Sequence, residues 1–310
     1  MRVSDRIGRQ MKLHDLHVLM TVVQVGSMNK AATLLGTTQP AISRSIAELE
    51  LALGVRLLDR HQRGVEPTEF GRALLACGMA VFDELRQGVK NIEFLADPAA
   101  GEVRIGCSPV LSASFVSVVV DRLSRRHPRL VFHLVTADGE ALHRDLHERK
   151  VDLLVTRRWA PITDERLNFE FLVSDSYVVA AGVQHPLSRR RSIELAALAD
   201  EPWVMPIPGT VGGSVAIEAF RASGLDSPRV IAYAPVEARM SLVATGRFLS
   251  IISEHRLSTM RLAIKALPVR LPRASVPNGI VTLKKRTLGP PARLFIEHAR
   301  EVAKSLARRK

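Results

Sequence analysis

The chain has 310 residues, of which 46% are hydrophobic, and its formal net charge is +13. This length predicts about two or three globular units, the hydrophobic content excludes general disorder, and the basic balance favours a polyanionic partner such as DNA or RNA. The two cysteines lack the spacing of a disulfide framework or a zinc site, and without a signal peptide or a long apolar run we expect a cytoplasmic protein with no membrane partner.

Residues 1–10 are polar and unpatterned and are predicted to be a disordered extension, with Met11 as an alternative start. Two short helices are predicted to follow, separated at Gly26, because glycine accepts the positive φ of a helix end. The first presents an apolar stripe made of Leu16, Leu19, Met20 and Val23. The second is expected to bury Ala31, Ala32, Leu34 and Leu35. Its two alanines would let another helix approach closely.

A third helix is predicted to be capped by Thr38, after a turn closed by Gly36, and to end at Gly54. Its apolar face consists of Ile42, Ile46, Leu49 and Leu53. Its other face consists of Gln39, Pro40, Ser43, Arg44 and Ala47. Two helices joined by a tight turn are typical of a helix-turn-helix, whose second helix enters the DNA major groove. An ordinary amphipathic surface helix is the alternative, and the alanine-rich helix before the turn argues against it.

A small hairpin is predicted next, in which residues 55–58 and 65–67 flank the loop 59–64. Arg60 and Arg63 would lie at its tip and contact phosphate groups, which position a protein on DNA without reading its sequence. A solvated turn is the alternative interpretation of this loop.

Residues 16–68 resemble the DNA-binding region of the LysR-type transcriptional regulators. The matching segments are Ala31-Ala32, Thr38-Gln39-Pro40-Ala41-Ile42-Ser43, Leu49-Glu50, Leu57-Leu58-Asp59-Arg60 and Pro67-Thr68. The resemblance implies an α+β multidomain protein with a winged helix-turn-helix, a long linker helix and a two-lobed α/β effector domain like a periplasmic binding protein. It also implies a homo-oligomer, either a homodimer or a homotetramer. The predicted DNA-binding residues are Thr38, Gln39, Pro40, Ser43, Arg44, Arg60 and Arg63.

A linker helix is predicted from Thr68 and Glu69 to about Ala96. Its heptad-like apolar seam, suited to pairing with a second copy, consists of Leu75, Phe82, Leu85, Val89 and Ile92. Gly78 and Gly88 interrupt this seam and each weakens an isolated helix by about 1 kcal/mol, so the helix is expected to depend on its partner. A helix packed only on its own domain is the alternative.

The predicted domains are therefore a winged helix-turn-helix over residues 11–67, a linker helix and hinge over 68–100, and a two-lobed domain over 101–310. In the last domain, predicted strands at 103–106, 130–135, 151–155, 177–181, 203–205, 230–232 and 248–252 alternate with helices at 113–126, 140–149, 215–222 and 291–308. Alternation of this kind predicts parallel sheets covered by helices. The segments 167–173 and 267–271 are expected to cross between the lobes, and the last helix to return to the first lobe.

Parallel sheets bind ligands beyond the carboxyl ends of their strands, close to helix N-termini. The residues predicted there, and hence to bind an effector, are Ser108, Val110, Thr136, Asp138, Thr156, Arg157, Thr210 and Ser214. Helix capping and surface ion pairs are the alternative roles for these side chains. The basic lining favours a small anion, and an organic acid or a sugar-derived metabolite is expected.

No catalytic motif is present, since the sequence contains no GxSxG, HExxH or GxGxxG, and we predict no enzymatic activity and no cofactor. His143 and His147 have metal-ligand spacing but no third ligand, so no metal site is predicted. The predicted function is a sequence-specific regulator that binds promoter DNA under the control of a metabolite between the lobes, with RNA polymerase as a further candidate partner. The alternatives are a solute-binding module whose N-terminal helices mediate assembly, and an enzyme that uses the cleft.

Overall fold

The computed structural model describes residues 11–61, 64–137, 139–158, 161–272 and 274–308. The chain forms two compact units, Met1–Gly88 and Val89–Lys310. The predicted disordered extension, residues 1–10, lies outside the described residues. No helix of the described part combines the length and the apolar character needed to cross a bilayer.

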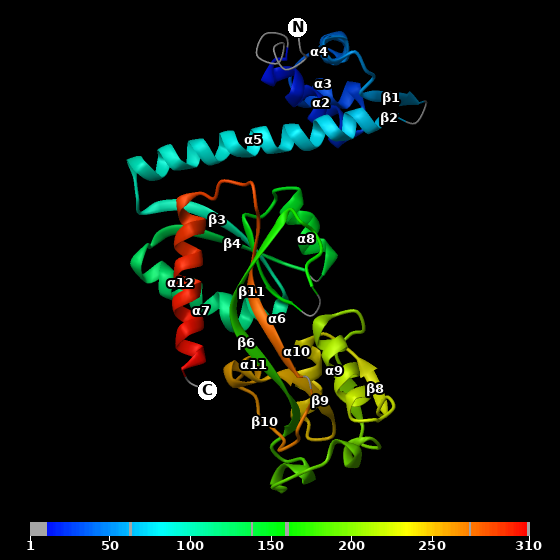
Figure 1. Ribbon diagram of the computed structural model, residues 1–310, viewed down its shortest axis with the longest axis vertical. Coiled ribbons are helices and arrows are strands. Elements are labelled where there is room, and N and C mark those ends of the chain that lie inside the picture. Colours follow the sequence, from blue (N-terminus) through cyan, green and yellow to red (C-terminus); the bar gives the residue numbers. More distant parts are fainter. Residues whose placement is uncertain (1–10, 62–63, 138, 159–160, 273, 309–310) are drawn as a thin grey trace. The chain divides into compact units, whose positions relative to one another are not determined.

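In its described residues, the N-terminal unit contains three short helices, a hairpin and the first part of a long helix (Figure 1). Its elements are α2 (Leu13–Val25), α3 (Met28–Leu34), α4 (Gln39–Leu53), β1 (Leu58–His61), β2 (Gly64–Pro67) and α5 (Glu69–Ala96). As predicted, α2 and α4 end at glycines in the left-handed conformation, Gly26 and Gly54. The helices enclose one apolar core, which includes Leu19, Ala31, Ile42, Ile46, Leu49 and Leu57.

Two details of the predicted helix faces are wrong. The buried stripe of α2 consists of Leu16, Val18, Leu19 and Val22, and Met20 and Val23 are only half-buried. On α3, Ala31 and Ala32 are buried as predicted, but Leu34 is 65% exposed. The reason is that α3 has only seven residues, and its buried side runs through Met28, Ala31 and Ala32, which leaves Leu34 beside that stripe.

The hairpin strands lie closer to its tip than predicted, because β1 begins at Leu58 instead of residue 55 and β2 begins at Gly64. Asp59, Arg60 and His61 belong to β1 instead of the loop, and they pair with Glu66, Val65 and Gly64 of β2. Arg60 therefore lies on a strand and not at the tip, while Arg63 lies outside the described residues.

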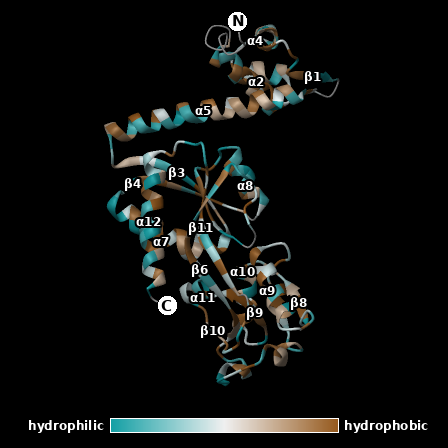
Figure 2. Ribbon diagram, in the orientation of Figure 1, coloured by the Kyte–Doolittle hydropathy of each residue, from teal (hydrophilic) through white to brown (hydrophobic). Residues whose placement is uncertain are grey.

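The long helix α5 spans the predicted linker, and brown and teal segments alternate along it (Figure 2). Gly78, which is predicted to interrupt the seam, also has a packing role. It is buried where α2 packs, and a Cβ atom there would lie 3.0 Å from Met20 Sδ and 3.1 Å from Leu16 Cδ1. The glycine thus lets α2 approach α5 closely, a packing role that helix propensity does not reveal.

The first lobe of the C-terminal unit is built from β3 (Ala100–Cys107), α6 (Pro109–Leu111), the π-helical turn η2 (Ser112–Val116), α7 (Ser117–Arg126), β4 (Arg129–Thr136), α8 (Glu140–His147), β5 (Leu153–Arg157) and α12 (Pro290–Ala307). Its core includes Ile105, Phe115, Leu123 and, from the returning helix α12, Phe295 and Ala299. The predicted return of the last helix is confirmed. The predicted hinge is shorter than expected, because β3 already begins at Ala100, and the predicted helix 113–126 is three consecutive helical segments that start at Pro109.

The second lobe is built from β7 (Trp203–Met205), α9 (Val211–Ala222), β8 (Val230–Tyr233), α10 (Val236–Ala244), β9 (Leu249–Ser253), α11 (Glu254–Thr259) and β10 (Ile264–Ala266). Trp203 and Phe220 meet edge to face at its centre, with ring centroids 5.3 Å apart. Val215, Leu249 and Ile251 complete the same buried cluster.

Two long antiparallel strands, β6 (Leu167–Gly182) and β11 (Ser275–Leu283), connect the lobes (Figure 1). Within the described residues they join all the strands of this unit in the order β4-β3-β5-β11-β6-β9-β7-β8, with β10 beside β6. The parallel pairing that we predict holds for β4-β3-β5 and for β9-β7-β8. It is wrong for β6, which pairs antiparallel with its neighbours β9 and β11. The strand β11, which is not among the predicted strands, also pairs antiparallel, with β5 and β6.

The predicted crossing segments also need correction. Residues 167–173 and 177–181 form one strand, β6, and its crossing partner is β11 instead of 267–271. The sequence does not predict β11, because its strand pattern is broken at Pro277, Asn278 and Gly279. The pairing register with β6 shifts between Asn278 and Gly279.

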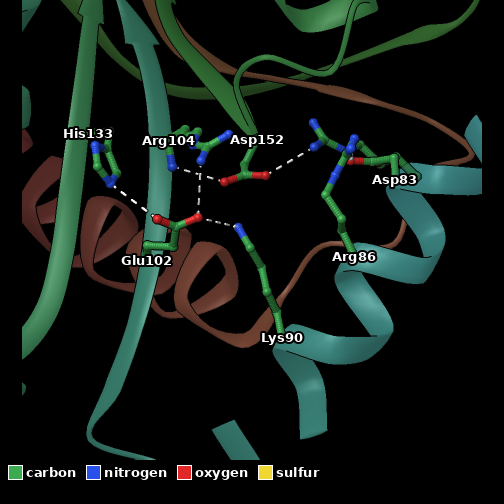
Figure 3. Close-up of polar contacts among 8 residues, drawn as sticks. Asp83, Arg86, Lys90, Glu102, Arg104, His133 and Asp152 are labelled. Carbon is green, nitrogen blue, oxygen red and sulfur yellow. Dashed lines mark hydrogen bonds and ion pairs between the residues drawn. The ribbon is translucent and has the colours of Figure 1, made fainter. Parts of the chain in front are cut away.

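Glu102 on β3 connects basic side chains from α5, β3 and β4 (Figure 3). Its carboxylate lies 3.2 Å from Lys90 Nζ, 3.3 Å from Arg104 Nη2 and 3.3 Å from His133 Nε2. Burial raises the pKa of Glu102, but the hydrogen bond and charge of Lys90, with the charges of Arg104 and His133, outweigh it and hold this pKa below its ordinary value of 4.5.

The lowered pKa of Glu102 predicts a pH-dependent contribution to stability. A carboxyl whose pKa is depressed on folding stabilises the protein above its unfolded pKa and loses this effect as the pH falls through its folded pKa. We expect Glu102→Gln to lower the melting temperature at pH 7, and the difference from wild type to shrink as the pH falls below 4.5. Glu93→Gln, at an exposed α5 carboxylate, is the control. A difference that is the same at pH 7 and pH 4 would contradict this assignment.

The close contact of β6 and β11 predicts that Gly279 tolerates no side chain. A Cβ atom there would lie 2.3 Å from the Glu170 carbonyl oxygen and 2.4 Å from Phe169 Cζ. We expect Gly279→Ala to destabilise the C-terminal unit by about 1–3 kcal/mol, measured by thermal unfolding. The control is Gly88→Ala on α5, where a Cβ meets nothing within 4 Å and alanine favours the helix. Equal melting of wild type and Gly279→Ala would rule out so tight a contact.

Candidate nucleic-acid interface and ligand cavity

The polar face of α4 is open to solvent. Gln39, Pro40, Arg44 and Ala47 are exposed and Ser43 is half-buried. The opposite face, with Ile42, Ile46 and Leu49, is buried in the core of the N-terminal unit. Thr38 is the N-cap residue in an extended conformation, but its side chain makes no capping hydrogen bond, contrary to the prediction. Short polar side chains on an exposed helix that follows a tight turn can reach base edges in the major groove.

The hairpin contributes a basic side chain beside this face. Arg60 Nη2 of β1 lies 3.5 Å from Ser43 Oγ of α4 and donates a hydrogen bond to it. Strand and helix therefore present Arg60, Ser43 and Arg44 on connected parts of one surface, where a phosphate contact and base contacts can be made together. Of the predicted DNA-binding residues, only Arg63 cannot be placed, because it lies outside the described residues.

A cavity of about 260 Å³ lies between the two lobes of the C-terminal unit. The side chains that line it come from both lobes and from the connecting strand β6, and they include Val110, Arg157, Tyr177, Ile207, Thr210, Val236, Glu237, Arg239, Ile252 and Ser253. Six of these ten side chains are polar or charged, and the other four are apolar. Cavities of this kind are typical of sites for small ligands, which combine an apolar lining with a few polar groups.

Of the predicted effector-binding residues, Val110, Arg157 and Thr210 line this cavity. Four others do not, namely Ser108, Thr136, Thr156 and Ser214. Ser108 is buried and accepts a capping hydrogen bond from the Leu111 N–H at 3.5 Å, so its alternative role as a helix cap is the one seen. Thr136 is exposed at the end of β4, and Asp138 lies outside the described residues.

Sequence reasoning missed four polar cavity residues, Tyr177, Glu237, Arg239 and Ser253. Arg239 had a usable signal, because it lies on α10 between Val236, Met240 and Val243, all of which are buried. A charged residue within such an apolar pattern is unusual unless it is paired or functional. Ser253 also had a signal, because it ends β9, a strand that pairs in parallel with β7, at the edge where ligands bind. Tyr177 gave no comparable signal, since its place in the cavity depends on the pairing of β6 with β9.

Two arginines dominate the electrostatics of the cavity. Arg157 Nη1 donates a hydrogen bond to the Tyr177 hydroxyl, and Arg239 Nη1 donates to Ser250 Oγ at 2.6 Å and to the Ile251 carbonyl at 2.8 Å. Burial lowers the pKa of Arg239 to about 10, and the like charge of Arg157 adds to the lowering. Arg239 therefore still carries a positive charge at neutral pH.

A buried carboxylate on β6 belongs to a separate hydrogen-bond group. Asp175 accepts hydrogen bonds from the Ser253 hydroxyl and from the His255 backbone N–H, the latter at 3.3 Å. The His255 ring reaches the first lobe, where its Nε2 lies 3.2 Å from the Ser114 carbonyl oxygen. Asp175 is thus held by the second lobe and makes no ion pair with Arg157 or Arg239 among the described residues.

Elsewhere, no group of three His, Cys, Asp or Glu side chains in the described part of the chain is placed to hold a metal ion. His147 Nε2 lies 2.9 Å from Asp164 Oδ2, and burial lowers the pKa of the neighbouring His143. Cys107 is buried in the first-lobe core, and this burial raises the pKa of its thiol, as for a structural cysteine.

Comparison with known families agrees with the two sites described above, the exposed face of α4 and the cavity between the lobes. The family described as "LysR substrate binding domain" matches residues 96–304, and "Bacterial regulatory helix-turn-helix protein, lysR family" matches residues 13–72. The first match alone covers more than half of the chain. The chain belongs to the LysR family of transcriptional regulators. It is therefore a regulator with a helix-turn-helix DNA-binding domain and an effector-binding domain, and not an enzyme.

Similar proteins cover nearly the whole chain. The regulator GbpR of Azospirillum brasilense is 25% identical over 97% of this chain and 89% of its own length, and PcaQ of Agrobacterium fabrum is 28% identical over 97% of both. Among solved structures, a full-length OxyR variant from Pseudomonas aeruginosa has a TM-score of 0.69 at 18% identity, covering 95% of this chain and 97% of its own. CbnR in complex with its target DNA has a TM-score of 0.57 at 20% identity, covering 94% and 100%. The structural likenesses show the shared fold.

Proposed function

We propose that this LysR-type regulator reads a promoter operator with the exposed face of α4. The observation that carries the proposal is the clean division of α4 into a buried apolar face and an exposed polar face that contains Ser43 and Arg44. Base contacts are assigned to Gln39, Pro40, Ser43 and Arg44, and Thr38 is assigned a place at the groove edge. Arg60 and Arg63 on the hairpin are assigned phosphate contacts.

The cavity between the lobes is proposed to hold the small-molecule effector. Its lining comes from both lobes, so a bound molecule would favour the interlobe geometry that contacts it best. We propose that this preference is passed through the linker to the spacing or bending of the DNA. RNA polymerase is a further proposed partner, and the site of action is the compartment that holds the DNA, the bacterial cytoplasm.

Assembly is proposed to use the apolar stripe of α5. Leu85, Val89, Ile92 and Leu95 are exposed large hydrophobic side chains on this helix, with the spacing of one helical face. The resemblance to the family implies a homo-oligomer, and a second copy of α5 would cover this stripe in a homodimer or homotetramer. Two recognition helices held at a fixed spacing could then read two half-sites.

We propose a corresponding division of labour along the chain. Residues 11–67 bind DNA, residues 68–100 connect and pair the subunits, and residues 101–310 bind the effector. The alternative of a solute-binding module with purely structural N-terminal helices has no support, since the N-terminal match is to a DNA-binding family.

If the exposed face of α4 reads the DNA sequence, removing a side chain from this face should reduce the preference for the operator. Arg44→Ala should weaken binding to the operator by about 1–3 kcal/mol and leave binding to random DNA nearly unchanged. The operator is first recovered by sequencing the genomic fragments that the wild-type protein retains, and affinities are compared at fixed salt. Arg270→Ala, at an exposed arginine of the C-terminal unit, removes the same charge as a control. If folded Arg44→Ala and Ser43→Ala both keep full sequence preference, the assigned face is wrong.

The assembly assignment predicts that a charge within the α5 stripe weakens subunit pairing. Ile92→Asp would place a carboxylate in an apolar interface, and we expect it to weaken assembly by about 2 kcal/mol or more. Molar mass measured by light scattering should fall toward that of the monomer, whereas Glu93→Ala on the neighbouring position should leave it unchanged. An unaltered mass for Ile92→Asp would mean that other surfaces hold the subunits together.

A further inference from the structure

The cavity between the lobes contains two guanidinium groups that lack an anionic partner. Arg157 is 8% exposed and Arg239 is 5% exposed, so each side chain is more than nine-tenths buried. Neither forms an ion pair with any carboxylate in the described part of the chain, although both line the cavity. Their known hydrogen-bond acceptors are neutral, namely the Tyr177 and Ser250 hydroxyls and the Ile251 carbonyl.

Each arginine also has an unused donor. The Nε–H groups of Arg157 and Arg239 are buried and have no hydrogen-bond acceptor among the described residues. Burying a charge without a partner is costly, and such groups are ordinarily paired or bound to an ion. The charge of Arg157 also acts directly on Arg239, since it lowers the pKa of that guanidinium. Two like charges therefore face one small space.

We infer that this cavity binds the carboxylate group of a small organic acid, with Arg157 and Arg239 as its charged ligands and Tyr177 as a third hydrogen-bond donor. The inference rests on the proposed effector role of the cavity and names the chemical class of the effector. A carboxylate offers two acceptor oxygens, so that one can accept from each guanidinium.

The rest of the cavity lining indicates which kind of molecule would carry the carboxylate. Val110, Ile207, Val236 and Ile252 give the cavity a largely apolar wall, which suits a hydrocarbon body and not the many hydroxyls of a sugar. A phosphate would leave further charged oxygens against this wall. The volume of about 260 Å³ lies just below the usual range of about 300–1,000 Å³ for ligand sites, so the acid must be small.

One carboxylate of the protein, Glu237, also lines the cavity, but it is exposed and paired. Its Oε1 lies 3.6 Å from Arg256 Nη2, and it forms no ion pair with Arg157 or Arg239 among the described residues. Its charge does favour the charged form of Arg239, but burial has the larger effect and still lowers the pKa of that guanidinium. Glu237 also places a negative charge at the rim, where an acid with a second carboxylate would meet repulsion. A monocarboxylate fits this distribution best.

The position of the two arginines gives the ligand a mechanical role. Arg157 ends β5 of the first lobe, while Arg239 lies on α10 of the second lobe. An anion held by both would join the lobes and remove the repulsion between the two guanidinium groups. Binding should therefore favour one interlobe geometry, which is the property that an effector needs.

The test compares acids with their uncharged amides. Hexanoate and cyclohexanecarboxylate are titrated against the full-length protein at pH 7.5, beside hexanamide, cyclohexanecarboxamide and glucose, by calorimetry and by thermal shift. We expect both acids to bind and to raise the melting temperature, and the neutral compounds to bind at least about tenfold more weakly. Arg157→Gln and Arg239→Gln should each weaken acid binding about tenfold or more, and Arg270→Gln should not.

A further variant, Arg239→Lys, distinguishes the loss of the guanidinium group from the loss of folding. Arg239→Lys keeps the positive charge but loses the planar fork, and it should retain part of the affinity for the acids. Binding of the amides or of glucose as tight as that of the acids would overturn the inference, as would no binding of either acid. Binding of neutral compounds to the cavity would leave the proposed effector role intact. Failure of the regulator role itself would appear separately, as absence of operator binding by the wild-type protein.

Discussion

The antiparallel pairing of β6 with β11 is the constraint on which the C-terminal unit depends. The ladder runs from Leu167 opposite Leu283 to Ser176 opposite Ser275 and so carries the backbone from one lobe to the other. On one side β11 holds β5, which ends in Arg157, and on the other side β6 holds β9, where Tyr177 faces Ser253 across the ladder. A glycine in this ladder, Gly279, admits the Phe169 ring and the Glu170 carbonyl. The cavity residues thus owe their common location to one piece of strand pairing.

The N-terminal unit shows how far local patterns alone can lead. Its helices are short, their apolar residues recur at helical spacing, and their ends are marked by Gly26 and Gly54, so the faces and limits of α4 follow from the sequence. The same reasoning failed where neighbouring elements decide the outcome. Leu34 is apolar yet exposed, and Gly78 is explained only by the approach of Leu16 and Met20. Periodicity predicts which side of a helix can be buried, but packing decides which residues on that side are covered.

The candidate cavity was harder to predict, because its residues come from segments far apart in the chain. The rule that ligands bind at the carboxyl ends of parallel strands found Val110, Arg157 and Thr210. It could not find Tyr177, because this residue lies on the antiparallel strand β6, which crosses between the lobes outside the parallel pattern. Ser253 ends β9, a strand of the parallel set, and so fits the rule although it was not predicted. The strand β11 itself was missed, because a proline and a glycine at its centre are poor strand formers and only the bulge at Asn278 accommodates them. Long-range pairing leaves no periodic signal in such a segment.

The two buried arginines connect the energetics of the fold to its regulation. Without a ligand, their like charges oppose close approach of the lobes, while the ring of His255 and the Ser114 carbonyl provide a contact that favours it. These opposing interactions need not be large to matter, since a shift of about 1.4 kcal/mol changes a two-state ratio tenfold. An anion bound by both guanidinium groups would replace their repulsion with attraction to a shared partner. The contact between His255 and the Ser114 carbonyl would stay in place. A neutral ligand of the same shape would only fill space and leave the repulsion unchanged. The sensitivity of the switch would then come from charge rather than from size, which gives a reason for the chain to keep two costly buried cations at the boundary between its lobes.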